Sequence, residues 1–203
     1  MGRWGGKTLG GAAALVVMAL GVTAHIQAGY WQDSRVLFEH ALSVTRNNFM
    51  AEFNLGCVDQ KEGYADSAIA HFSAALKAWP DYDMAHYNLA VALQRQGKLN
   101  EAIAHYQETI RLKPTFTRAY NNLGIAYSKQ HRFREEEAAY RSALKIDPDF
   151  DEARNNLAVA LYFAGNYAAA WDEVHLLQAH GFNPHPRFLP DLTAKMPDPE
   201  RAR

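Results

Sequence analysis

Hydrophobic positions along the chain follow a helical spacing and also a fixed longer period. Between residues 49 and 184, apolar residues return every three or four positions, as they do in amphipathic helices. A triplet of asparagine, leucine and a small residue returns every 34 residues: Asn54-Leu55-Gly56, Asn88-Leu89-Ala90, Asn122-Leu123-Gly124 and Asn156-Leu157-Ala158. A period of this length predicts an array of helical repeats.

Other positions keep the same period and indicate what each unit contains. A turn glycine stands at Gly63, Gly97 and Gly165, with His131 as the exception. A small residue stands at Ala68, Ala102 and Ala170, with Glu136 as the exception. A large ring follows at Phe72, Tyr106 and Tyr140, and a proline closes the unit at Pro80, Pro114 and Pro148. Glycine permits a sharp turn, small residues permit close approach, and proline ends a helix, so each unit is predicted to be a helical hairpin.

This pattern resembles the tetratricopeptide repeat, and the resemblance implies an all-α solenoid of helical hairpins wound as a right-handed superhelix. Four full repeats are expected, at residues 49–82, 83–116, 117–150 and 151–184. Residues 31–48 match only the second helix of a repeat and are expected to form a half repeat. Residues 185–203 are expected to form a capping and disordered tail.

Some positions depart from the family pattern. Glu52 and Asp59 stand where the family has large apolar residues, so the first helix of repeat 1 is expected to be looser or to face a partner. Residues 183–190 contain too many prolines for a helix to be expected there. Phe188, Leu189 and Leu192 are expected to cover the apolar face that a terminal repeat leaves open.

The N-terminal segment, residues 1–30, is apolar and is predicted to hold a transmembrane anchor. No acidic residue, lysine or arginine occurs from Thr8 to Gln32. As a helix, residues 8–30 would be about 35 Å long, enough to span a hydrocarbon core of roughly 30 Å. Arg3 and Lys7 precede the segment, which favours a cytoplasmic N-terminus and an array on the other side of the membrane. A signal peptide cleaved after Ala24 and a buried core helix are the alternatives.

A second resemblance concerns the junction between this segment and the repeats. An apolar segment that runs into Tyr30-Trp31-Gln32-Asp33-Ser34 and a half repeat resembles the C-terminal region of polytopic membrane tetratricopeptide proteins, which include O-mannosyltransferase-like members. In that group the catalytic acidic residues lie in the membrane portion, which this chain lacks. The resemblance therefore implies no catalytic activity for these residues.

Composition excludes several other classes of function. The formal net charge is -1, whereas a nucleic-acid-binding protein needs a basic face. Cys57 is the one cysteine, so neither an intrachain disulfide nor a cysteine zinc site is possible, and a packing role is expected for its thiol. The nine histidines show no HExxH spacing, and no glycine-rich phosphate loop or serine nucleophile motif occurs. No catalytic residue, metal or cofactor is predicted.

The resemblance implies that the first helices of the repeats line a concave groove that holds a peptide or a helix. The recurring asparagines, Asn54, Asn88, Asn122 and Asn156, would face it and pair with a peptide backbone through their amides. The preceding residues, Phe53, Tyr87, Asn121 and Asn155, are candidates beside them. The alternative is that each asparagine bonds the backbone of the neighbouring repeat and fixes the stacking.

Three cations recur seven residues after the first three of these asparagines, at Lys61, Arg95 and Lys129. As a basic stripe they would contact acidic side chains or a terminal carboxylate of a partner. The alternative is a set of solvated helix ends, where cations suit the helix dipole.

The sequence therefore predicts a single-pass, membrane-anchored scaffold, on the extracytoplasmic side, that binds a partner polypeptide in its groove. Two alternatives remain: the accessory repeat domain of a membrane glycosyltransferase, and a secreted periplasmic binding protein.

Overall fold

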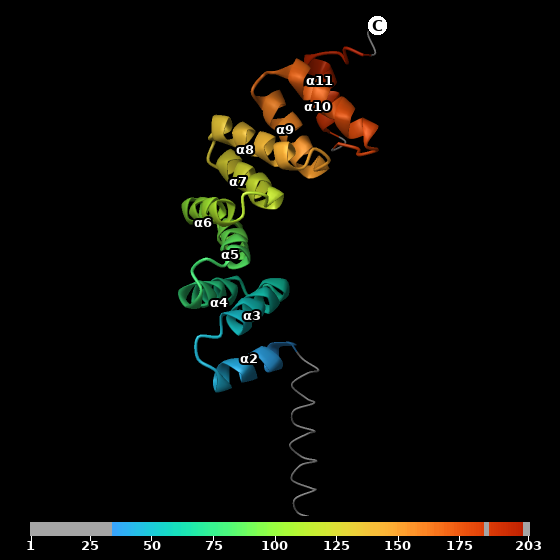
Figure 1. Cartoon of the computed structure of the whole chain (residues 1–203). Helices are drawn as coiled ribbons and strands as arrows, with labels where there is room; N and C mark the ends of the chain where they lie inside the picture. The colour runs from blue at the N-terminus through green and yellow to red at the C-terminus, as the bar shows by residue number, and fades with distance from the viewer. Residues whose placement is uncertain (1–33, 185–186, 201–203) are drawn as a thin grey trace, which may run out of the picture. The chain divides into compact units, whose positions relative to one another are not determined.

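The computed structural model describes residues 34–184 and 187–200, which form helices joined by short turns (Figure 1). No strand occurs within these two ranges, so the all-α prediction is confirmed for this part of the chain. The predicted anchor, residues 1–30, lies outside the described residues. Among the helices of the described ranges, none combines the length and the apolar character that crossing a bilayer requires.

The described helices divide into two compact units, with the division between Trp79 and Pro80. The first unit contains α2 (Ser34–Val44), α3 (Phe49–Glu62) and α4 (Ala65–Ala78). The second contains α5 (Asp83–Arg95), α6 (Leu99–Leu112), α7 (Thr117–Lys129), α8 (Phe133–Ile146), α9 (Asp151–Phe163), α10 (Tyr167–Ala179) and α11 (Phe188–Lys195).

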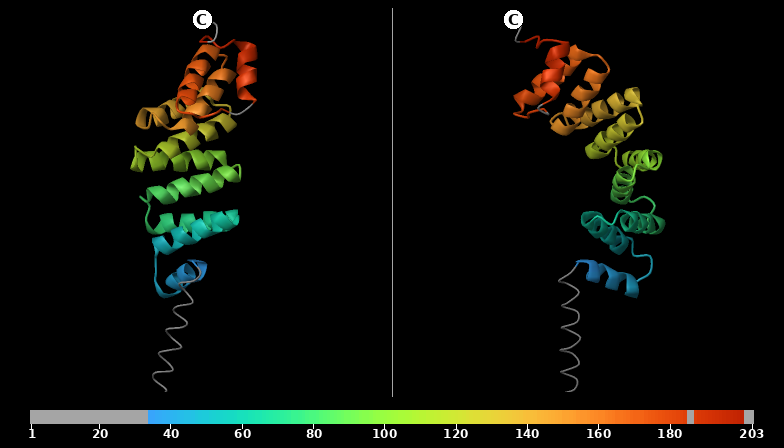
Figure 2. Two further views of the ribbon diagram at one scale, coloured as in Figure 1. Left: turned by 90° about the vertical axis from the view of Figure 1, so that its right-hand side faces the viewer. Right: turned by 180° about the vertical axis from the view of Figure 1, so that it is seen from behind.

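Consecutive helices pair as hairpins, as the 34-residue period predicts. In the first unit α3 pairs with α4, and α2 packs on α3. In the second unit the hairpins are α5–α6, α7–α8 and α9–α10, and α6 contacts α7 while α8 contacts α9 (Figure 2). The second unit is therefore a stack of three hairpins, which is the arrangement of a helical solenoid.

Close approach of the two helices of a hairpin depends on the small residues of the repeat. A Cβ atom built on Gly124 of α7 would lie 2.4 Å from Cε1 of Tyr140 on α8, and one on Gly56 of α3 would lie 2.6 Å from Cε1 of Phe72 on α4. These distances are too short for any real side chain, so glycine is needed for these ring positions.

An ion pair attaches the half-repeat helix α2 to the first hairpin. Arg35 on α2 donates to Asp59 at 2.6 Å and to Glu62 at 2.9 Å, both on α3. Asp59 is only 1% exposed and also accepts from Ser67 on α4. Burial alone would raise the pKa of Asp59, but the bonds from Ser67 and Arg35 outweigh it and lower the pKa. The expectation that Asp59 loosens α3 or faces a partner is wrong, because its carboxylate is paired inside the unit.

A related polar pair joins the two helices in three of the four hairpins, always between residues 19 positions apart. Glu52 contacts Nδ1 of His71 at 2.7 Å, which also corrects the expectation for Glu52. The imidazoles of His86 and His105 meet at 2.9 Å, and Arg154 donates to Glu173 at 2.8 Å. Three of the four repeats thus carry their own version of one inter-helix contact.

The last hairpin is covered by α11, which corrects the expectation that the proline-rich tail is not helical. Pro190 is the third residue of α11, and a proline is tolerated in the first turn because the amide hydrogens there lack an intrahelical acceptor. Phe188 and Leu192 are buried in one cluster with Leu157 and Trp171, and Leu189 packs at its edge. The expectation that these three residues cover the open apolar face is confirmed.

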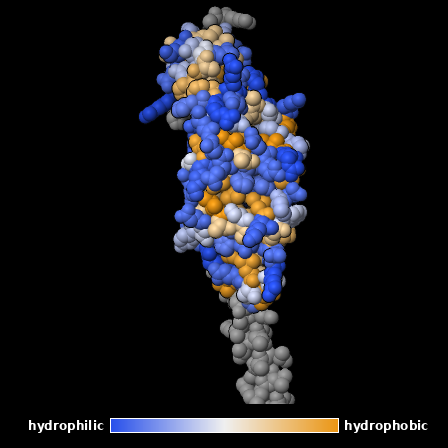
Figure 3. All heavy atoms as spheres, turned by 90° about the vertical axis from the view of Figure 1, so that its left-hand side faces the viewer, coloured by the Kyte–Doolittle hydropathy of each residue, from blue (hydrophilic) through white to orange (hydrophobic). Residues whose placement is uncertain are grey.

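The face drawn in Figure 3 is mainly hydrophilic, and hydrophobic residues appear on it in small groups. The exposed large hydrophobic side chains are correspondingly scattered over several helices: Val36, Val44, Met50, Tyr64, Trp79, Met84, Phe133, Ile146, Phe163 and Leu176. Scattered exposure of this kind is ordinary for a protein surface and does not define a binding patch.

Candidate functional site

The first helices of the three hairpins in the second unit, α5, α7 and α9, contact one another in turn. Their half-buried polar side chains form what we call the first-helix face. It includes the predicted residues Asn88, Asn122 and Asn156, one on each helix. The repeat period therefore brings these three asparagines to equivalent places on neighbouring helices.

Two of the three asparagines bond a neighbouring repeat. Asn122 Nδ2 donates to the hydroxyl of Tyr87 at 3.0 Å, and Asn156 Nδ2 donates to Asn121 Oδ1 at 2.9 Å. Both bonds join residues 35 positions apart, so each links one first helix to the next. The stacking interpretation therefore holds for these two amides, although through side chains rather than through backbone groups.

Hydrogen-bonding capacity remains on this face. Within the described residues, the amide of Asn88 has no hydrogen-bond partner, and Oδ1 of Asn156 accepts no hydrogen bond. Asn121 is buried, and its Nδ2 makes only a long 3.5 Å contact with Asn122 Oδ1. The half-buried amide of Asn88 and Oδ1 of Asn156 can still pair with a bound polypeptide.

Asn155 has a different environment from the other candidates. Its Oδ1 is buried and has no hydrogen-bond partner among the described residues. By the 35-residue offset that joins Asn121 to Asn156, the donor for Asn155 would stand at position 190, which is Pro190 of α11. A proline has no side-chain donor, so the series of bonds between repeats ends at the cap.

The corresponding residues of the first unit lie on α3. Asn54 donates its Nδ2 to the carbonyl oxygen of Met50 in the same helix at 2.7 Å. Phe53 lies against Phe72 of α4, with 5.8 Å between the ring centroids. In the second unit, the ring of Tyr87 stacks on Phe116 at 4.8 Å, and burial raises the pKa of its hydroxyl.

The three predicted cations are exposed and lie at helix ends. Lys61, Arg95 and Lys129 occupy the last turns of α3, α5 and α7. A cation in the last turn of a helix interacts favourably with the helix dipole. Lys129 is also at the edge of a pocket, which connects it to the first-helix face.

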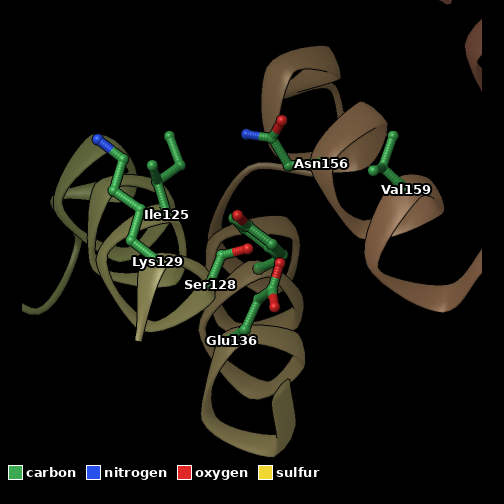
Figure 4. A pocket seen from close by; sticks show the side chains of 7 residues that line it. Ile125, Ser128, Lys129, Glu136, Asn156 and Val159 are labelled. Atoms are coloured by element: carbon green, nitrogen blue, oxygen red, sulfur yellow. The ribbon is translucent and has the colours of Figure 1, made fainter. Parts of the chain in front are cut away.

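That pocket, which we call the Glu136 pocket, opens between α7, α8 and α9 and has a volume of about 350 Å³ (Figure 4). Asn156 and Val159 of α9 and Ile125 of α7 line it, together with Ser128, Lys129 and Tyr140. Glu136 of α8 also lines it and is only 5% exposed. The sequence identified Glu136 only as an exception to the small-residue position, and did not predict its place in a pocket.

The single cysteine and the histidines near the end of the array have structural surroundings. Cys57 is half-buried, and burial raises the pKa of its thiol, which disfavours the nucleophilic thiolate. No cluster of three histidine, cysteine or acidic side chains suited to a metal ion occurs in residues 34–184 and 187–200. His175 and His180, near the end of the array, instead contact Asp198 at 3.0 Å and Asp151 at 2.8 Å.

Stacked hairpins that recur every 34 residues, with small residues and rings at recurring positions, define a helical-repeat solenoid. Comparison with family models agrees for the central part of the chain: residues 95–130 match one described as "TPR repeat", and residues 117–150 match one described as "Tetratricopeptide repeat". Residues 95–150 therefore carry tetratricopeptide repeats. No curated protein sequence matches the chain.

Several solved structures share this fold. "Crystal structure of MamA" has a TM-score of 0.67 and 21% identity, over 74% of this chain and 88% of that one. "MamA 41-end from Desulfovibrio magneticus RS-1" has a TM-score of 0.69 and 17% identity, over 82% and 93%. "First TPR of Spaghetti (RPAP3) bound to HSP90 peptide SRMEEVD" has a TM-score of 0.57 and 24% identity, over 60% and 97%. At these identities the likeness shows the fold.

Nothing in these comparisons supports the predicted resemblance to O-mannosyltransferase-like membrane proteins. Of the junction that suggested it, residues 30–33 lie outside the described residues, and the part that follows from Ser34 forms α2.

Proposed function

We propose that this chain is a non-enzymatic scaffold that binds an extended segment of a partner polypeptide along the first-helix face. The observation that carries the proposal is the unused hydrogen-bonding capacity of Asn88 and Asn156 on this face, where Asn156 also lines the Glu136 pocket. An asparagine amide offers a donor and an acceptor, so a row of them can pair with a peptide backbone whatever its sequence. The repeat domain of RPAP3, which has a similar fold, is bound to an HSP90 peptide, and this supports a peptide ligand here.

The asparagines provide a test that separates binding from stacking. Asn88→Ala removes no hydrogen bond of the described structure, so we expect weaker partner binding at unchanged stability. Asn122→Ala removes the bond to Tyr87 and should also cost about 1 kcal/mol of unfolding free energy.

The measurement is cross-linking of the full chain to its partner in cells, with a photoreactive residue at position 159, where Val159 lines the pocket and every candidate asparagine is left in place. A photoreactive residue at Arg141, an exposed position of α8 that does not line the pocket, is the control. Capture at position 141 but not at position 159, or capture at position 159 that Asn88→Ala leaves unchanged, would contradict the proposal.

We further propose that residues 8–30 anchor the chain in a membrane with the repeats on the extracytoplasmic side. The support is the length of the uncharged segment and the position of Arg3 and Lys7 before it. In a bacterial host the full chain should remain with membranes washed in sodium carbonate, and protease added to spheroplasts should digest the repeats. A soluble mature chain that begins after Ala24 would show a cleaved signal peptide instead.

A further inference from the structure

Glu136 is a buried acid at a repeat position that elsewhere holds alanine. Ala68, Ala102 and Ala170 are all fully buried at this position. A carboxylate there is costly, because burial removes its hydration unless a partner compensates. Packing within the hairpin does not explain why a carboxylate stands here despite this desolvation cost, because alanine fills the same position in the other three repeats.

The carboxylate has little compensation within the described structure. Ser128 of α7 is its hydrogen-bond partner, and no lysine, arginine or histidine of the described ranges forms an ion pair with it. Burial raises the pKa of Glu136, and the bond from Ser128 only partly opposes this effect. Figure 4 shows the ammonium group of Lys129 directed away from Glu136, at the outer edge of the pocket. An acid with one neutral partner is thus left facing an open cavity.

The rest of the pocket suits a long side chain with a charged end. Ile125 and Val159 supply apolar walls, and the buried ring of Tyr140 lies beside Glu136. The aliphatic stem of an arginine or lysine can pack against such walls while its charged head reaches the carboxylate. A guanidinium also offers paired donors to a carboxylate, and a charge-assisted bond is about twice as strong as a neutral one.

We propose that the Glu136 pocket is a specificity pocket for an arginine or lysine side chain of the partner polypeptide. This inference rests on the proposed function, since the basic residue would be presented by a segment bound along the first-helix face. Asn156, which lines both the face and the pocket, would hold the backbone next to that residue. Lys129 at the edge is exposed, so solvent and salt screen its charge from the incoming residue.

The test uses the purified full chain and a library of synthetic blocked nonapeptides in which one position at a time is fixed. The fixed residue is arginine, lysine, glutamine, norleucine or glutamate. We expect one position at which arginine or lysine binds about tenfold or more tightly than norleucine or glutamine, as for a hydrogen bond to a charged group. Glu136→Gln should reduce this preference to about twofold while preferences at other positions persist.

Two variants make the test specific. Glu136→Ala restores the residue of the other repeats, so it is expected to fold and to lose the basic preference as well. Glu137→Gln changes a neighbouring acid that pairs with Arg141 outside the pocket, and should keep the preference.

The possible failures are distinguishable. Peptide binding without a basic preference, or with a preference that survives in Glu136→Gln, overturns the specificity pocket and leaves the proposed function in place. If no peptide binds at all, both the proposed function and this inference are contradicted.

Discussion

At the residue scale, His131 shows how one position of the repeat departs from the pattern at a cost. Its φ is 58°, while the equivalent glycines have φ between 76° and 89°. A side chain with a Cβ is unfavourable in this left-handed region, and glycine is not. The exception visible in the sequence is therefore a strained turn in the structure.

We expect His131→Gly to stabilise the second unit by about 0.5–1 kcal/mol, because relief of strain exceeds the added entropy of the unfolded chain. Urea denaturation of the wild type and the variant measures the change. Gly97→His places the same side chain at the equivalent turn of repeat 2 and should destabilise the chain by a similar amount.

The contact between His86 and His105 is a second residue-scale feature, because its hydrogen bond needs a neutral His86 ring as the acceptor. Nε2 of His86 donates to the carbonyl oxygen of Pro80 at 2.8 Å, so Nδ1 of neutral His86 must accept and Nδ1 of His105 must donate. Protonation of both rings leaves no acceptor between them. Burial first, and then the charge of His86, lower the pKa of His105, although Glu101 and Glu108 act in the opposite direction.

This arrangement predicts that stability falls in mild acid. The folded pKa of His105 lies below its unfolded value of about 6.5, so the unfolded chain binds the proton first as the pH decreases. Stability should be full above that pH, decline below it, and level off once the pH is under the folded pKa. Thermal melting of the wild type and of His105→Gln between pH 8 and pH 4.5 tests this, and equal slopes for the two proteins would contradict it.

At the element scale, the bonds between first helices couple neighbouring hairpins. The hydroxyl of Tyr87 on α5 accepts from Asn122 on α7, across one full repeat. The sequence predicted which residues recur, and it left open whether they bind a ligand or the next repeat. Whether such an asparagine bonds the next repeat depends on the side chain 35 positions earlier, which is Tyr87 for Asn122 and Asn121 for Asn156. The period alone does not specify that side chain, so the sequence pattern could not decide between the two roles.

A double-mutant cycle measures this coupling. Tyr87→Phe and Asn122→Ala should each destabilise the chain, and the double variant should be more stable than additivity predicts, by about 0.5–1.5 kcal/mol. Additive effects would show that the bond contributes nothing to stacking. Asn88→Ala with Tyr87→Phe serves as a control pair, since Asn88 makes no bond to Tyr87.

The helix content and the hairpins were predictable because they depend on local spacing and on turn residues. The environment of Asp59 was not, since its partner Arg35 lies 24 positions away in a half repeat. The helix α11 was also missed, because Pro190 was counted as a helix breaker without regard to its place in the first turn. The Glu136 pocket was missed because a cavity depends on three helices at once, although the replacement of alanine by an acid was a visible signal.

At the scale of the whole molecule, a repeat array has only neighbour contacts, so a change at one end remains local. Leu192 of α11 is fully buried against α9 and α10 residues. Leu192→Ala should destabilise this end by about 2–4 kcal/mol through the cavity that it leaves.

Hydrogen exchange measures where this loss occurs. We expect faster exchange in α9, α10 and α11, while α5 and α6 keep their protection. Uniform loss of protection throughout the second unit would show instead that it unfolds as one cooperative body. Thr193→Ala, at an exposed neighbouring position of the same helix, is the matched control.

The cap also has a consequence for self-association. By the 34-residue period, Pro190 corresponds to Asn156, and α11 corresponds in sequence to the first helix of a further repeat. A second copy of the chain could not dock here as the next hairpin, because its surface is already occupied and no side-chain donor is offered to Asn155. Proteins built from identical stackable units can polymerise into fibres. At this end of the array the eight residues of α11 block such polymerisation.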